Sequence, residues 1–251
     1  MKITKLLLTA GFSIALSLLC TKVSAATFYV DNSLTDTNVN SSTPDCTTYN
    51  TQSYTCGSGL EQAYVSIGDI NAITLVPGDN ILFRSGRTWV GSQLIISGSG
   101  TNDEKITISS FGGQTRPILN GNNVAQRNIN TNAKNHIVIS NLELTNATAF
   151  GVFLNGGSSI LVDNVVSHNN KIEGIRFASS SSTIQNSEIY DNGGTANHVG
   201  IWFAGNVSGT VDNVNIYDTG SGIQRTGLYT FQASGAGNLT IKNSHIYNHP
   251  R

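Results

Sequence analysis

The sequence is poor in cysteine, methionine, proline and charge, and these shortages exclude several classes of protein. It has three cysteines, one methionine and four prolines in 251 residues, and only 12% of its residues are charged. Three of the 14 basic residues fall within the first 25 positions, so the rest of the chain has 11 basic against 15 acidic residues and a net charge of −4. This balance argues against nucleic acid as a partner.

Long apolar runs are missing after the first 25 residues. Lys2 and Lys5 precede an apolar stretch from Leu6 to Leu19, and small residues follow, so residues 1–25 are predicted to be a secretory signal peptide. The alternative, a transmembrane anchor, needs about 20 apolar residues. We therefore expect a secreted or periplasmic protein with no membrane span after signal cleavage. Cys46 and Cys56 are the cysteines that remain, too few for a structural zinc site, and we expect them to form a disulfide.

Two repeated markers dominate the second half of the chain. An apolar-x-apolar-x-Asn run, followed by a second short apolar run, occurs five times, at Asn141, Asn164, Asn186, Asn213 and Asn243. A glycine that opens a short strand recurs between them, at Gly151, Gly174, Gly200 and Gly227. A shared period with three short strands per repeat indicates the turns of a parallel β-helix. Leucine-rich repeats share the period, but they need regular leucines and a helical segment that are missing here.

The asparagine repeat also predicts which side chains point inward. The residue two before each asparagine is apolar, and so is the residue three after it, except at Ser167. Because side chains alternate along a strand, these positions form inward columns on both sides of the asparagine. The asparagine must then occupy a tight bend, for which the left-handed conformation suits it, and the stacked amides are expected to bond to one another.

The ends of the chain are less regular. Residues 59–73 carry apolar residues at helical spacing, and we expect a short amphipathic helix there to cap the first coil. Residues 26–75 then form an N-terminal strand, a disulfide loop and the capping helix, and residues 76–251 form the coils. The sequence stops directly after the fifth asparagine unit, which predicts a β-helix truncated at its C-terminus. The alternative is a short protein that caps itself by dimerising or by docking to a partner.

The first coils resemble a known superfamily. The block VPGDNILFRSGRTWVGSQLIISGSGTNDEKITISSFGGQTRPILNG, residues 76–121, is similar to the opening coils of pectate-lyase-like β-helix proteins, especially the branch that contains alginate lyases and chondroitin-B lyases. The resemblance implies a right-handed β-helix that acts on a polysaccharide. In the similar lyases a glutamate cluster binds calcium beside a catalytic lysine and arginine. No such glutamate cluster is found in this sequence, so calcium is implied by the resemblance only and no metal ligands are predicted.

The glycine-led strands predict a binding face. Alternation leaves four residues pointing outward in one column: Phe153, Arg176, Trp202 and Tyr229. Exposed aromatic residues of this kind mark binding sites, their flat rings match the apolar faces of sugars, and an arginine pairs with a hydroxyl or carboxylate. The alternative is that overhanging loops bury the column as a satellite core.

Polar residues near this column are candidates for catalysis. A polysaccharide lyase needs a cation that neutralises the uronate carboxylate, for which Arg176 or Arg225 is available, and a base, for which Lys171 or His198 is available. A hydrolase needs paired carboxylates. Asp191 and Asp218 lie in equivalent positions, but that column of Asn and Asp is better explained by turn capping.

Three functions therefore remain open from the sequence. The first is a secreted polysaccharide lyase or lyase-like protein, and the second is a non-catalytic carbohydrate-binding or adhesin-type surface β-helix. The third, a glycoside hydrolase, ranks below the lyase because the outward column of the glycine-led strands contains no carboxylate.

Overall fold

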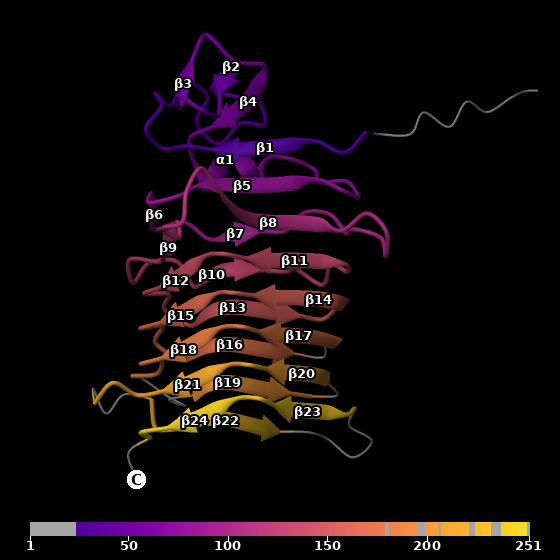
Figure 1. Cartoon of the computed structure of the whole chain (residues 1–251), viewed down its shortest axis with the longest axis vertical. Helices are drawn as coiled ribbons and strands as arrows, with labels where there is room; N and C mark the ends of the chain where they lie inside the picture. The colour runs from indigo at the N-terminus through magenta and orange to yellow at the C-terminus, as the bar shows by residue number, and fades with distance from the viewer. Residues whose placement is uncertain are drawn as a thin grey trace, which may run out of the picture.

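Three parallel sheets wind into a β-helix whose coils stack along one axis (Figure 1). The computed structural model describes residues 24–178, 181–194, 199–205, 207–220, 224–231 and 237–249. The β-helix predicted from the two repeated markers is confirmed. Nearly all of the predicted signal peptide lies outside the described residues, as does the predicted site residue His198.

Each circuit of the chain adds one strand to each sheet. Sheet A contains β1 (Thr27–Val30), β2 (Cys46–Asn50), β3 (Thr55–Cys56), β4 (Glu61–Tyr64), β5 (Asn80–Arg84), β8 (Ile106–Phe111), β11 (Ile137–Ser140), β14 (Ser158–Asp163), β17 (Ser181–Gln185), β20 (Ser208–Asp212) and β23 (Leu239–Lys242). Sheet B contains β6 (Thr88–Val90), β9 (Ile118–Asn120), β12 (Glu143–Thr145), β15 (Val166–His168), β18 (Glu188–Tyr190), β21 (Asn215–Tyr217) and β24 (His245–Tyr247). Sheet C contains β7 (Leu94–Ile95), β10 (Arg127–Asn130), β13 (Phe150–Asn155), β16 (Glu173–Ala178), β19 (Val199–Ala204) and β22 (Thr226–Phe231).

The bend between sheets A and B is made by one left-handed asparagine in each of the last five coils. The five predicted asparagines have φ between 50° and 57°. Their side chains bond from coil to coil: Asn164 Nδ2 donates to Asn141 Oδ1, and Asn213 Nδ2 donates to Asn186 Oδ1, both at 2.8 Å. The ladder is interrupted at Asn186, which donates to an oxygen of Asp163 instead. The predicted bends are therefore confirmed, and the predicted ladder forms in part.

The corner between sheets B and C is tight, which explains the second marker. A Cβ atom on Gly174 would lie 2.5 Å from Cγ2 of Ile189 and 2.8 Å from the carbonyl oxygen of Gly200. On Gly200 it would lie 2.6 Å from Cγ2 of Ile216. Real side chains do not approach so closely, so only glycine lets this corner pack against sheet B and the next coil.

The core is the column of inward side chains from all three sheets. Ile139, Val162, Ile184 and Val211, each two residues before its asparagine, are fully buried. Ser167, which breaks the other column, is also buried and donates its hydroxyl hydrogen to the carbonyl oxygen of Gly174. That the β-helix continues beyond residue 251 stays a prediction.

The N-terminal cap differs from the prediction. The helix α1 (Ile67–Asn71) has only five residues, and the segment before it is the strand β4 rather than helix. This strand pairs in parallel with β1 and antiparallel with β2, which satisfies its backbone groups at the end of sheet A. Ile67 and Ile70 of α1 still join the main core.

The predicted disulfide is confirmed within this cap. Cys46 of β2 is bonded to Cys56 of β3, and Cys46 is buried beside Tyr49 and Ala63 in a small core of the cap. No helix in the described part of the chain is long and apolar enough to cross a bilayer.

The left-handed bend can be tested at Asn213, which is exposed and has φ 54°. The substitution Asn213→Ala should lower the free energy of unfolding by about 1 kcal/mol more than Asn213→Gly, because only the alanine suffers the left-handed strain. Both variants lose the same amide bond to Asn186. Urea unfolding of the two variants measures the difference, and equal stabilities would contradict the assignment of strain to this bend.

Candidate sugar-binding face

Two columns of side chains cover the outer surface of sheet C. Strand register aligns Asn130, Phe153, Arg176, Trp202 and Tyr229 in one column, and Arg127, Phe150, Glu173, Val199 and Thr226 in the other. The columns lie on the same surface, because the rings of Phe150 and Phe153 are 5.2 Å apart and residues of both columns line one hollow. We call these ten residues the sheet C face.

Guanidinium groups and aromatic rings alternate along this face. The Arg127 guanidinium carbon lies 4.5 Å from the ring centre of Phe153, and that of Arg176 lies 4.5 Å from the ring centre of Trp202. Arg176 also lies 5.0 Å from the ring of Phe150. Stacking of this kind is favourable because the ring face attracts the cation. It holds two positive charges in fixed positions on one surface.

Burial affects the electrostatics of Arg127. Burial, and then the charge of Arg176, lower the pKa of Arg127. The Nε atom of Arg127 is buried without a hydrogen-bond partner. Two cations that repel each other on a partly dry surface favour an anion that binds between them.

The last two described coils of sheet C enclose a hollow. Val199, Trp202, Thr226 and Tyr229 line a space of about 240 Å³. The rings of Trp202 and Tyr229 meet edge to face, with their centres 5.3 Å apart and their planes at 89°. Tyr229 is 44% exposed, and Nε1 of Trp202 is buried without a hydrogen-bond partner. The hollow thus combines an exposed ring with an unused donor.

Glu173 is a fully buried carboxyl group on this face. Its Oε1 lies 3.6 Å from Nη1 of Arg176, and neither carboxyl oxygen has a hydrogen-bond partner. Burial raises the pKa of Glu173 to about 8, although the positive charge of Arg176 opposes the rise. The carboxyl group is therefore neutral at pH 7, and the charge of Arg176 is not cancelled.

The structure brings together the four residues predicted for binding. Phe153, Arg176, Trp202 and Tyr229 form one column, as the alternation predicts. Their binding role, and the catalytic roles of Lys171, Arg176, His198 and Arg225, stay predictions. Lys171 lies two residues before β16, where its backbone N–H donates to the carbonyl oxygen of Ala147, and Arg225 is exposed directly before β22.

Sequence reasoning missed the second column. Strict alternation back from Val152 would turn Phe150 inward, and Glu173 likewise. The tight glycine corner breaks this alternation, so the residue before each glycine joins the outer surface instead. The residues of the second column can be identified in the sequence because each stands directly before a marker glycine. They are Phe150, Glu173, Val199 and Thr226.

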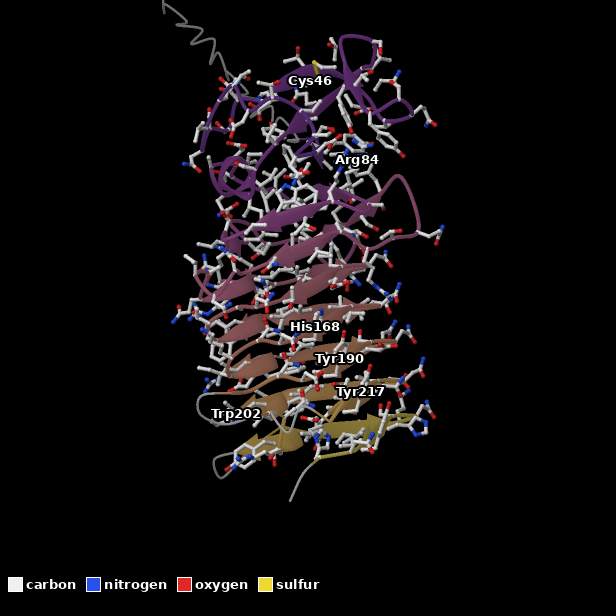
Figure 2. All side chains as sticks on the ribbon, turned by 90° about the vertical axis from the view of Figure 1, so that its left-hand side faces the viewer. Cys46, Arg84, His168, Tyr190, Trp202 and Tyr217 are labelled. Carbon is white, nitrogen blue, oxygen red and sulfur yellow. A yellow bond between two sulfur atoms is a disulfide. The ribbon has the colours of Figure 1, made fainter. Side chains whose placement is uncertain are left out.

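Sheet B carries a different aromatic column, which sequence reasoning also missed. His168, Tyr190, Tyr217 and Tyr247 stack with ring centres 4.8 to 5.1 Å apart and planes within 16° of each other. Figure 2 shows the first three one below another along the long axis. We call these four rings the ring stack. Inside the stack each ring face is covered by the neighbouring ring, so only the ring edges are accessible to a sugar.

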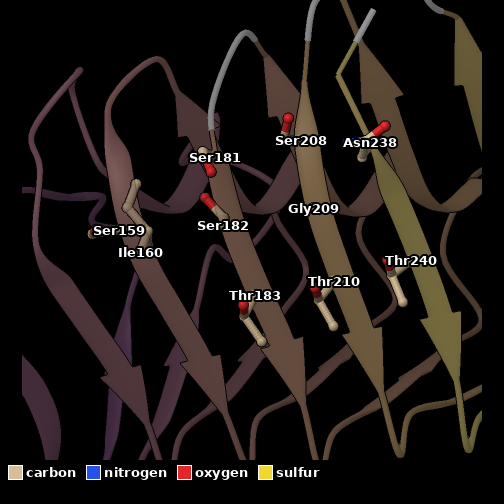
Figure 3. A pocket seen from close by; sticks show the side chains of 10 residues that line it. All are labelled: Ser159, Ile160, Ser181, Ser182, Thr183, Ser208, Gly209, Thr210, Asn238 and Thr240. Carbon is tan, nitrogen blue, oxygen red and sulfur yellow. The ribbon is translucent and has the colours of Figure 1, made fainter.

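A second hollow lies on sheet A and is lined mainly by hydroxyl groups. It measures about 430 Å³ and includes Thr183, Thr210 and Thr240 from three neighbouring strands, with Ser181, Ser208 and Asn238 in the next row (Figure 3). None of its ten lining residues is charged or aromatic. It therefore offers less to an anionic sugar than the sheet C face does.

The described acidic residues do not form a calcium site on the sheet C face. That face contains one carboxyl group, Glu173, and an arginine beside it disfavours a cation. Carboxylates of Asp36, Asp45 and Asp69 come within 4.8 Å of one another, but in the N-terminal cap. There Asp45 accepts backbone hydrogen bonds from Thr37 and Val65, and Asp69 caps α1.

Comparison with known proteins identifies the family and the fold of the chain. The family described as Pel9A-like, right-handed β-helix region matches residues 58–218, more than half of the chain. An alginate lyase from Paenibacillus sp. str. FPU-7 has a similar structure, with a TM-score of 0.55 and 21% identity over 67% of this chain and 69% of that one. A comparison with curated proteins finds no match.

Two longer structures are also similar. The pectate lyase Pel9A gives a TM-score of 0.58 and 16% identity over 89% of this chain and 54% of that one. A GH136 lacto-N-biosidase from Eubacterium ramulus gives a TM-score of 0.52 and 14% identity over 77% of this chain and 40% of that one. The chain thus spans about half, or less, of these two proteins. At these identities the similarity shows the fold alone.

The buried carboxyl group makes a prediction about stability. Because the pKa of Glu173 rises from an ordinary 4.5 to about 8 on folding, the folded chain keeps this proton longer than the unfolded chain. The contribution of Glu173 to stability is therefore most favourable below pH 4.5 and is lost as the pH rises towards 8. Glu173→Gln removes this loss and should gain on the order of a few kcal/mol at alkaline pH.

The gain can be measured by urea unfolding of Glu173→Gln and the parent protein at a series of pH values. The difference between them should be small near pH 4.5 and grow until about pH 8. Glu188→Gln, an exposed glutamate of sheet B, is the matched control and should show no such growth. Parallel stability curves for Glu173→Gln and the parent would contradict the buried, neutral carboxyl group.

Proposed function

Because the chain belongs to the Pel9A-like right-handed β-helix family, we propose that it binds an acidic extracellular polysaccharide along the sheet C face and acts as a polysaccharide lyase or lyase-like protein. The observation that carries this proposal is the alternation of Arg127 and Arg176 with the rings of Phe153 and Trp202. Rings pack on the apolar faces of sugars, and guanidinium groups pair with carboxylates.

The dimensions of the face suit a short stretch of polymer. The column from Phe153 to Tyr229 spans three coil steps of about 4.8 Å, or about 15 Å, which is enough for about three sugar units. Two of the similar structures are an alginate lyase and a pectate lyase. The polymers in these names, alginate and pectate, carry a carboxylate on each uronate unit. A polymer of this kind would present regularly spaced anions to the two guanidinium groups.

A lyase reaction divides into two tasks on this face. Neutralising the uronate carboxylate makes the proton on the adjacent carbon more acidic, and a base then removes that proton. The electron pair left behind forms a carbon–carbon double bond as the glycosidic carbon–oxygen bond breaks, and the leaving oxygen takes up a proton, which gives the unsaturated sugar end. We assign the first task to Arg176, which is fixed between the rings of Phe150 and Trp202. For the second task we retain Lys171 and His198, and Arg225 remains a second candidate for the cation. A glycoside hydrolase is less well supported, because the described face offers no carboxylate pair.

Secretion is part of the proposal. The apolar leader of residues 1–25 supports export. The disulfide between Cys46 and Cys56 is consistent with an oxidising compartment. A polysaccharide outside the cytoplasm would be encountered there.

Binding tests the proposal through two variants. Trp202→Ala should weaken the binding of an oligouronate and of neutral oligosaccharides at least tenfold, since a central aromatic residue commonly contributes about 2 kcal/mol or more. Arg176→Ala should weaken only the oligouronate, by a similar factor. Isothermal titration with oligogalacturonate, oligoguluronate and cello-oligosaccharides measures the affinities.

Tyr217→Ala, within the ring stack of sheet B, is the matched control and should leave the affinities unchanged. A stable Trp202→Ala protein with unchanged affinity would refute the sheet C face as the site. If the parent protein binds no glycan and Trp202→Ala melts at a lower temperature, the sheet C face is a packed core rather than a binding site. Release of unsaturated sugar ends, followed by ultraviolet absorbance, separates a lyase from a protein that only binds.

A further inference from the structure

Arg176 has an unusual partner directly beneath it. Glu173 lies 3.6 Å from Nη1 of Arg176, yet its side chain is wholly buried and neither oxygen accepts a hydrogen bond. Buried carboxyl groups in proteins normally have hydrogen-bond partners, and one without them needs a physical explanation. A purely structural ion pair would be expected to show bidentate hydrogen bonds between the two groups.

The surroundings of Glu173 offer little to stabilise a negative charge. The flanking strands β13 and β19 place apolar side chains in register with it. On its own strand the charged neighbour is Arg176, and Lys171 lies two residues before it in the chain. Arg127 lies on β10, beyond β13, on the same face. Within the described residues these are the charged groups on or next to this part of the face.

We propose that Glu173 acts through Arg176 as a specificity-determining residue: it is uncharged when the face binds an anionic sugar, and its ionisation weakens that binding. This inference rests on the proposed function and adds to it the charge state in which the face accepts a uronate. In the uncharged state the sheet C face presents the two positive charges of Arg127 and Arg176 to the ligand.

Ionisation of Glu173 would have two consequences for an anionic ligand. The new negative charge 3.6 Å from Arg176 competes with the uronate for the same guanidinium group. It also repels the uronate directly, through a partly dry region where screening is weak. Neutral sugars are subject to neither effect. Because the pKa of Glu173 is raised to about 8, the change occurs at mildly alkaline pH.

The size of the effect follows from linkage. If one proton must be retained for tight binding, the affinity for an oligouronate falls by at most about tenfold for each pH unit above the pKa. Reciprocally, a bound oligouronate raises the pKa of Glu173 by the same coupling. Glu173→Gln keeps the shape of the side chain but cannot ionise, so its affinity should stay at the low-pH level throughout.

The experiment measures the affinity for oligogalacturonate and for a neutral cello-oligosaccharide from about pH 6 to about pH 10. The parent protein should lose about tenfold or more in affinity for the acidic ligand above pH 8, and none for the neutral ligand. Glu173→Gln should abolish the loss. The matched control Glu188→Gln, on sheet B, should retain it.

The outcomes distinguish this inference from the proposed function. If oligogalacturonate and oligoguluronate fail to bind at every pH, the proposed function is wrong and the inference fails with it. If they bind with an affinity that does not change with pH, or changes equally in Glu173→Gln, only the inference is overturned. Should Glu173→Gln fail to fold, the parent protein alone tests the inference. Equal pH profiles of affinity for the acidic and the neutral ligand would then contradict the role of Glu173.

A second readout needs no ligand. Arg176 stacks on Trp202, so ionisation of Glu173 beside it should change the fluorescence of this tryptophan. The change should have its midpoint near pH 8 and be missing in Glu173→Gln. Trp202→Phe separates the emission from that of Trp89, the other tryptophan. A parent protein whose Trp202 emission is constant across this pH range would contradict the titration on which the inference depends.

Discussion

In the last five coils, the columns of side chains depend on the left-handed asparagine between sheets A and B. Because each of the five asparagines holds the same backbone conformation at the same place in its coil, the strands on both sides of it stay in register from coil to coil. A slip of one residue would turn every inward side chain outward. The register therefore maintains the fold. It also sets the alignment of Arg176 with Trp202 on sheet C, the sheet that follows sheet B in each coil.

The glycine corner then decides which side chains lie on the outer side of sheet C. Gly174 packs too closely against Ile189 and the next coil for a side chain. The corner changes the alternation, so the residue before the glycine also reaches the outer surface. A single outward column becomes two, and Glu173 is placed beneath Arg176 rather than in the core. A packing requirement of the fold thus creates the geometry of the candidate site.

These two corners explain what the sequence could and could not predict. The asparagine repeat predicted the inward columns, the glycine-led strands predicted the column from Phe153 to Tyr229, and together they predicted the β-helix, because period-two alternation holds between corners. The repeats did not predict the outward position of Glu173, because the alternation fails there. They also did not predict the ring stack of sheet B, because its four residues are not of one type and have only an aromatic ring in common. The short capping helix predicted within residues 59–73 forms over Ile67–Asn71 only, because the residues before it form β4, which pairs with β1 of sheet A. Helical spacing does not report that tertiary pairing.

Sheets B and C use their outer aromatic residues differently. On sheet B the rings of the stack cover one another, so their favourable contacts are made within the protein. On sheet C the rings alternate with cations, the planes of Trp202 and Tyr229 are perpendicular, and two donors and a carboxyl group remain without partners. Each unsatisfied group costs folding free energy, which the aliphatic core of the coils offsets. A ligand that supplied the missing partners would recover that cost, so these groups, together with the alternation of cations and rings, support the proposal that sheet C is the binding face.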